Sequence, residues 1–227
     1  MLFRSIVVVL VVVHVEMALG LAMALLFAHG APFRKLMIAG VLAPYAVSEV
    51  GAVVMWRSMF DPDTGFVTRL LGGVGLPPLE WSVYPAHGLT LVALLSIWLH
   101  LPFTFIILYA ARLSIPRDLH EAAAIDGASA WQGFLRVTLP LLMPAILIAM
   151  LFRYIFAYRL FSEVWLLTGG GPARSTEVVA TYLYLEAFRY NDFGAATATG
   201  WLMVVTSLAL ALVYLRRLYR EMMARGA

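Results

Sequence analysis

The sequence predicts an all-α, polytopic bundle of helices that cross a membrane. Of its 227 residues, 63% are hydrophobic and only 13% are charged, roughly half the charged share of an ordinary soluble domain. Several continuous apolar runs approach the ~20 residues that a helix needs to cross a bilayer. A membrane barrel would instead need short segments in which apolar and polar residues alternate, so we expect helices.

Five apolar runs define the expected spans. They cover residues 6–27, 36–56, 89–111, 139–166 and 195–215. Pro44 and Pro102 lie inside the second and third runs, where neighbouring helices can satisfy the carbonyl groups that a proline leaves without a donor. The fourth run is interrupted by Arg153, Arg159 and Glu163. Arg159 and Glu163 are four residues apart, so they could pair along one helix face; the alternative is that they face a cavity or the interior of the bundle.

The basic residues predict the orientation of the spans, because cytoplasmic connections retain the excess of lysine and arginine. One set of connections holds Arg34, Lys35, Arg112, Arg117, Arg136, Arg216, Arg217, Arg220 and Arg225. This places the loop 112–138 and the C-terminus in the cytoplasm and the segment 168–194 outside. An odd number of spans then places Met1 outside.

The segment Glu121–Pro140 is the most informative part of the chain. It reads EAAAIDGASAWQGFLRVTLP, a helix-forming run broken by Gly127, which permits a sharp turn. A second short helix over residues 129–135 can begin with Ser129 as its cap. Trp131 and Phe134 are three residues apart, so they share a helix face and could anchor in the pocket of a partner.

This segment resembles the signature cytoplasmic loop of the permease subunits of binding-protein-dependent ABC importers. The resemblance implies that the loop couples the membrane domain to a separate ATPase, whereas the alternative is a solvated amphipathic loop between two spans. The implied coupling residues are Glu121, Ala122, Ala123, Asp126, Gly127, Ala128, Trp131, Phe134, Leu139 and Pro140.

Other parts of the chain resemble the carbohydrate-uptake, maltose-type branch of these permeases. The matching segments are residues 19–26, Thr168–Pro172 and Ser175–Glu177, and the similarity runs from Ile6 to Arg220. It implies that residues 1–227 form a single importer membrane domain. Because the related permeases have one more helix before the first span seen here, we expect that helix to be missing from this chain.

Two groups of residues are candidates for contact with a substrate and with a binding protein. Tyr154, Tyr158 and Phe161 recur at helical spacing on the fourth span and predict an aromatic stripe, with Arg153 or Glu163 beside it. Such a stripe can stack on a sugar, although helix packing or an interfacial aromatic belt explains it as well. The resemblance assigns contact with the binding protein to a glycine-rich turn, for which a plain flexible loop is the alternative. This turn consists of Gly169, Gly170, Gly171 and Pro172.

The resemblance implies a permease subunit of an ATP-driven importer in a bacterial inner membrane. It implies no catalytic residue, no metal and no bound cofactor in this chain, with ATP and magnesium held by two copies of a separate ATPase. A second, homologous permease would complete the path, and an extracytoplasmic binding protein would deliver a monosaccharide, oligosaccharide or polyol. Peptide or phosphate-ester substrates remain open.

Two other classes of function fit the sequence less well. A secondary transporter or channel driven by an ion gradient could relay protons through Glu16, Glu49 and Glu163. It would not need the loop Glu121–Pro140, and the sequence shows no internal repeat of the kind common in such transporters. A membrane-embedded enzyme is disfavoured because the five histidines are scattered and form no catalytic motif. No basic cluster with interleaved aromatic residues indicates nucleic-acid binding.

Overall fold

The computed structural model describes residues 1–30 and 32–226, without the side chains of residues 217, 218 and 221–226. The longest helices are α1 (Leu2–Ala28), α5 (Pro85–Leu113), α8 (Leu139–Ala157) and α11 (Phe193–Gly226). The shorter elements are α2 (Arg34–Leu42), the 3₁₀ helix η1 (Ala43–Ala46), α3 (Glu49–Met59), α4 (Phe66–Gly73), α6 (Arg117–Ile125), α7 (Ala130–Gly133), the π-helical turn η2 (Phe134–Thr138), α9 (Ser162–Thr168) and α10 (Val179–Phe188).

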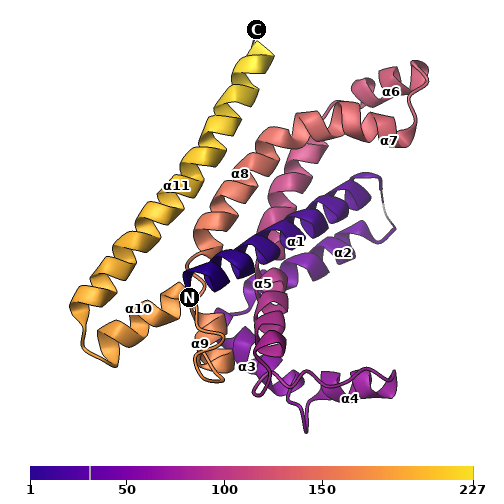
Figure 1. The fold of residues 1–227 in the computed structure, drawn as a ribbon. Coiled ribbons are helices and arrows are strands. Elements are labelled where there is room, and N and C mark those ends of the chain that lie inside the picture. Colours follow the sequence, from indigo (N-terminus) through magenta and orange to yellow (C-terminus); the bar gives the residue numbers. More distant parts are fainter. Residues whose placement is uncertain (31, 227) are drawn as a thin grey trace.

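The long helices form a bundle with α6 and α7 at one end and α4 and α9 at the other (Figure 1). Among the described residues, four helices are long and apolar enough to cross a membrane, and a bent helix pair supplies a fifth candidate span. The predicted ranges 6–27, 89–111 and 195–215 lie within α1, α5 and α11. The all-helical membrane fold that the sequence predicts is therefore confirmed.

The second predicted span, 36–56, is wrong as a continuous helix. Its two halves, Arg34–Ala46 and Glu49–Met59, meet at an angle of 103°. Pro44 lies in the 3₁₀ turn that ends the first half, where it has no N–H to continue an α-helical ladder. Ser48 then caps the second half by accepting a hydrogen bond of 3.1 Å from the Gly51 N–H. A proline followed by a strong cap thus makes a break, not a kink.

The fourth predicted span, 139–166, has a wrong end. Helix α8 stops at Ala157, and a turn over residues 158–161 separates it from α9. At the other end the helix extends backward through η2 to Ala130, so the apolar helix covers Ala130–Ala157. Arg159 is exposed whereas Tyr158 and Leu160 are buried. The turn changes the direction of the chain here, so that Arg159 can reach the surface while its two neighbours stay buried.

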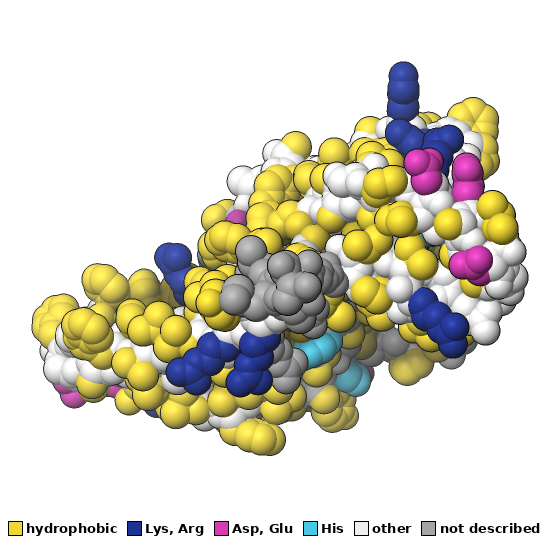
Figure 2. All heavy atoms as spheres, turned by 90° about the horizontal axis from the view of Figure 1, so that it is seen from above, with side chains coloured by type: hydrophobic (Ala, Val, Ile, Leu, Met, Phe, Trp, Pro, Cys, Tyr) yellow, Lys and Arg dark blue, Asp and Glu magenta, His cyan; other side chains and the backbone are white. Residues whose placement is uncertain are grey.

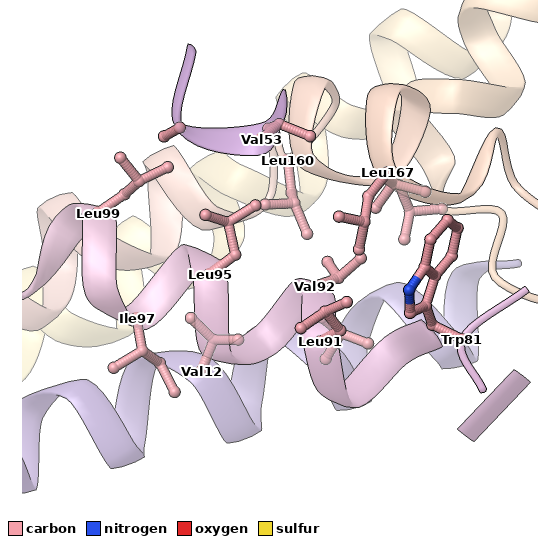
Figure 3. Close-up of a cluster of buried hydrophobic side chains, with 14 residues drawn as sticks. Val12, Val53, Trp81, Leu91, Val92, Leu95, Ile97, Leu99, Leu160 and Leu167 are labelled. Atoms are coloured by element: carbon pink, nitrogen blue, oxygen red, sulfur yellow. The ribbon is translucent and has the colours of Figure 1, made fainter. Parts of the chain in front are cut away.

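The largest hydrophobic cluster joins four helices around the middle of α5 (Figure 3). Leu91, Val92 and Leu95 of α5 have no exposed surface. Val12 of α1, Val53 of α3 and Leu167 of α9 pack around them, so the second half of the bent span and the short helix α9 share one core with α1 and α5. Burial of apolar area does not drive helices together in lipid, because the lipid tails are apolar as well. Close van der Waals packing between such side chains holds the helices together instead.

Helices α1 and α5 approach each other closely at Gly20. A Cβ atom at this position would lie 2.9 Å from Cγ2 of Thr104 and 3.4 Å from the backbone nitrogen of Phe105. Glycine therefore sets the distance between the two helices here, as small residues do in membrane helix packing.

A buried ion pair lies one helical turn before this contact. Glu16 of α1 is fully buried, and its Oε2 accepts a hydrogen bond of 2.8 Å from Nε of Arg153 in α8, whose side chain is 1% exposed. Nη2 of Arg153 lies 2.7 Å from the same oxygen, a charge contact without hydrogen-bond geometry. The Thr104 hydroxyl donates to the other carboxylate oxygen at 2.5 Å. One carboxylate thus joins α1, α5 and α8.

Replacing Gly20 with valine should destabilise the bundle by about 1–3 kcal/mol, because the larger side chain overpacks the contact with Thr104. Gly40→Val is the matched control, since a Cβ on Gly40 in α2 meets no atom within 4 Å. The measurement is the unfolding of the purified protein in detergent. Equal stabilities of the two variants would contradict the close approach of α1 and α5.

Truncating Glu16 to alanine should cost about 3–5 kcal/mol, because it leaves Arg153 buried without its counter-charge. The double variant Glu16→Leu, Arg153→Met should recover most of this loss, since apolar residues of similar size often replace a buried pair at little cost. A double-mutant cycle on unfolding free energy measures the coupling. Arg159→Met, which removes an exposed charge, is the control and should leave the unfolding free energy nearly unchanged. If the effects of the substitutions at Glu16 and Arg153 were additive, the two residues would not be paired.

Candidate coupling surface and membrane cavity

The predicted loop folds as two short helices around a left-handed turn. Helix α6 begins after Pro116 and carries Asp118 in its first turn, where an acidic residue is favoured by the helix dipole. Gly127 adopts a φ of +76°. The N–H of Gly127 donates to the Ala124 carbonyl at 3.0 Å, and that of Ala128 to the Ala123 carbonyl at 2.9 Å. This pair of bonds is a Schellman motif, which ends a helix and requires a residue such as glycine at the left-handed position.

Ser129 caps helix α7 as the sequence predicts. Its Oγ accepts a hydrogen bond of 3.3 Å from the Gln132 N–H, and the Gln132 side chain accepts one of 2.8 Å from the Ser129 N–H. This capping box satisfies two backbone donors that the start of a helix leaves free. The turn between α6 and α7 is therefore specified by local sequence on both sides of Gly127.

Large apolar side chains on this loop are exposed. Trp131 is 66% exposed and Ile125 is 86% exposed. The Trp131 and Phe134 rings lie side by side, with centroids 5.4 Å apart, so the predicted shared face is confirmed. Charged side chains gather at the end of the molecule where α6 and α7 lie, beside a largely hydrophobic remainder (Figure 2). Exposed aromatic groups beside charges are typical of a protein-binding surface.

The other predicted coupling residues are distributed along this surface. Glu121, Ala122 and Asp126 are exposed, whereas Ala123 and Ala128 are half-buried under α6 and α7. Leu139 and Pro140 form the first turn of α8. The separate second helix over residues 129–135 is wrong, because α7 continues through η2 into α8 without a break. A π-turn absorbs one extra residue within a helix, so the coupling surface is mechanically continuous with the span.

A polar cavity of about 200 Å³ lies where the two broken helices meet. Glu49 reaches it from the start of α3, His100 from the middle of α5, and Glu163 from α9. Ser96, Phe161 and Arg159 also line it. Carboxylates, a histidine and a hydroxyl beside aromatic rings can bind the hydroxyl groups and the apolar face of a small polar ligand.

The predicted aromatic stripe is wrong as one helix face. Tyr154 and Tyr158 are buried in a cluster with α1 and α11. The Tyr154 ring stacks on Tyr214 at 5.2 Å. Phe161 lies beyond the end of α8 and packs instead against Tyr184 of α10, at 5.1 Å. The helical spacing was interrupted by the turn after Ala157, so only Phe161 reaches the cavity.

The pairing of Arg159 with Glu163 is also wrong. Neither residue has a salt bridge among the described residues, and the turn places Arg159 before α9 and Glu163 within it. Arg153, which was expected beside the aromatic stripe, binds Glu16 instead. Ser96 and Ser162 also line the cavity and were not predicted from the sequence. A serine in an apolar run is a weak signal of a site, because its hydroxyl can equally well form a hydrogen bond with the backbone of its own helix.

The glycine-rich turn after α9 is closed by side-chain hydrogen bonds. Gly169 and Gly170 have φ values of +61° and +81°. The hydroxyls of Thr168 and Thr176 lie 2.8 Å apart, and the Thr176 hydroxyl donates to the Gly171 carbonyl at 2.8 Å. The turn lies at the opposite end of the bundle from α6 and α7 (Figure 1).

Contacts to the first helix fix the segment that follows this turn. The guanidinium of Arg4 donates to the carbonyls of Arg174 and Glu177, each at 3.0 Å. The Val179 N–H donates to the Ser5 hydroxyl at 2.9 Å. Residues 168–179 are thus held against the start of α1 as a defined surface. Across the described residues, no group of three histidine or acidic side chains is arranged to hold a metal.

Comparison with known proteins identifies the family. Residues 3–220 match the family described as "Binding-protein-dependent transport system inner membrane component". A probable ABC transporter permease protein of Brucella suis is 35% identical over 178 residues, which are 78% of this chain and 62% of that protein. The trehalose/maltose transport system permease protein MalF of Thermococcus litoralis is 35% identical over 207 residues, covering 90% of this chain and 69% of MalF. The chain therefore spans about two thirds of the length of these relatives.

A solved structure shows the same fold. One chain of a bacterial alginate ABC transporter, crystallised with an alginate pentasaccharide-bound periplasmic protein, superposes with a TM-score of 0.84 and 25% identity. The superposition covers 94% of this chain and 75% of that one. The chain belongs to the family of inner membrane components of binding-protein-dependent transport systems.

Proposed function

We propose that the chain is the permease subunit of an ATP-driven importer that takes up a carbohydrate. The surface formed by α6, Gly127 and α7 carries this proposal, because exposed Trp131 beside Phe134 fits the groove of a separate ATPase. Two ATPase copies would bind ATP and magnesium. A second, homologous permease would form the other half of the translocation path.

Helix continuity gives the coupling a physical route. Because α7 runs through η2 into α8, a displacement of the docked loop moves α8 as a lever. Arg153 on α8 holds Glu16 on α1, so the motion is passed to a second helix. The cavity lies beyond the far end of α8, where such a movement can open or close it to one side.

Carbohydrate is the substrate class that fits both the relatives and the cavity. MalF belongs to a trehalose/maltose system, and the solved transporter carries alginate. The cavity combines Phe161 with His100 and Glu163, and sugars bind to such mixtures of rings and hydrogen-bonding groups. At about 200 Å³ within one subunit, it would supply part of a site completed by the second permease.

The opposite end of the bundle suits an extracytoplasmic binding protein. The turn from Gly169 to Pro172 lies there, closed by the hydrogen bonds of Thr168 and Thr176. The C-terminal end of α11 lies at the same end as α6 and α7 (Figure 1), which supports a cytoplasmic C-terminus together with the basic residues of these connections.

An ion-gradient transporter fits the polar residues less well. A relay through Glu16, Glu49 and Glu163 needs carboxylates that exchange protons along a path. Glu16 is fully buried and bound by Arg153 and Thr104, so it is already neutralised. The coupling surface also has no role in such a transporter.

Replacing Trp131 with alanine should weaken ATPase binding by at least tenfold, because a docked aromatic side chain is the usual anchor of such an interface. Trp201→Ala is the matched control: Trp201 in α11 is also 66% exposed but lies far from the loop along the chain. The measurement is recovery of a P-loop ATPase and a second permease with the tagged chain from native membranes, by mass spectrometry. Recovery of this chain alone in a mild detergent would overturn the importer proposal.

Replacing Glu163 with glutamine should raise the KM for uptake about tenfold at pH 9 and change it little at pH 7. Burial and the neighbouring Glu49 raise the pKa of the Glu163 carboxyl to about 8, and only above this pH does the charged form strengthen a hydrogen bond by about 1.5 kcal/mol. Glu186→Gln on α10, outside the cavity lining, is the control. Uptake by the reconstituted complex is measured with the carbohydrate that its co-purified binding protein retains. An unchanged KM at pH 9 with an altered unfolding temperature would assign Glu163 to packing.

A further inference from the structure

A second, larger hollow lies between α6 and α7 and the ends of α1 and α5. Its volume is about 1020 Å³. Four basic side chains line it: His29 after α1, Arg112 at the end of α5, and Arg117 and His120 in α6. Glu121 is the one carboxylate among the residues lining it. Among the described residues, the hollow therefore combines the two fixed positive charges of Arg112 and Arg117 and two histidines with a single carboxylate.

The protein itself does not neutralise this charge. Nε of Arg112 and Nε2 of His120 are shielded from solvent and have no hydrogen-bond partner. None of the basic groups lining the hollow has a salt bridge in the described part of the chain. Burial, then the charges of Arg112 and His29, lower the pKa of His120. These groups are close enough to repel one another, which is unfavourable without an anion.

Helix dipoles explain only half of this cluster. Arg112 and His29 lie at the C-terminal ends of their helices, where a cation is favoured. Arg117 and His120 lie in the first half of α6, where the dipole favours an anion instead. Arginines and histidines gathered at both kinds of helix end therefore point to an anionic ligand.

The rest of the lining identifies the chemistry. Leu25, Leu113 and Ile115 supply an apolar wall at the ends of two membrane helices, the depth at which lipid headgroups lie. We propose that the hollow binds a phosphate anion, supplied either by the headgroup of an anionic phospholipid or by a soluble phosphate. Guanidinium and imidazole N–H groups would donate to its oxygens. This inference does not depend on the transported substrate.

The test uses the complex assembled with its ATPase and second permease, in nanodiscs of phosphatidylglycerol or of phosphatidylcholine. Native mass spectrometry counts the phosphatidylglycerol retained after delipidation, with and without inorganic phosphate. Arg112→Gln should weaken retention about fivefold, the effect of one basic group near a membrane surface. Arg136→Gln is the control, because Arg136 is an exposed residue of the same connection that does not line the hollow. Arg112→Lys should restore retention.

The outcomes separate the two sources of phosphate. Loss of phosphatidylglycerol in Arg112→Gln alone, insensitive to inorganic phosphate, assigns the site to a lipid headgroup. Displacement of the lipid by inorganic phosphate, or Arg112-dependent binding of phosphate in phosphatidylcholine, assigns it to a soluble anion. Equal retention in the unchanged complex and both glutamine variants overturns the proposal, as does a crosslink from position 112 to an acidic residue of the ATPase.

Discussion

The buried pair of Glu16 and Arg153 is the constraint on which the packing of the long helices depends. Two charges shielded from water are tolerated only when each is paired and hydrogen-bonded. Arg153 and Thr104 together meet the needs of the Glu16 carboxylate. This fixes the rotation of α1 and α8, and Gly20 one turn later lets α5 approach the same face of α1. An apolar bundle in lipid has few other directional forces to choose one arrangement.

The same pair connects the two regions that the proposed importer uses. The coupling surface is built from short-range features, a Schellman motif and a capping box around Gly127. It joins α8 through the π-helical turn η2, and Arg153 lies near the far end of that helix. The cavity beyond it is lined by residues at two chain breaks and by the continuous helix α5. Rigid helices moved at broken joints are a common device of membrane transporters.

Features that depend on neighbouring residues were easier to predict from the sequence than features that depend on contacts between distant parts of the chain. The Gly127 turn and the Ser129 cap depend on residues within five positions of one another, and both were predicted. The break at Pro44 and Ser48 was predicted as part of one continuous span, although the residues that make it are local. The partner of Arg153 could not be predicted, because Glu16 is 137 residues away in the chain and Arg159 and Glu163 offered a nearer pair.

The sequence by itself determined the membrane fold, the family and the turn between α6 and α7, because apolar length and local turn chemistry are properties of short segments. Only the tertiary structure decided which polar residues meet. It removed Tyr154 and Tyr158 from the candidate substrate path and brought Glu49, His100 and Glu163 together. It also placed Arg112 and His120 around one hollow. The spacing of residues along one helix cannot reveal such groupings, because they depend on where other helices end and on the angles at which they pack.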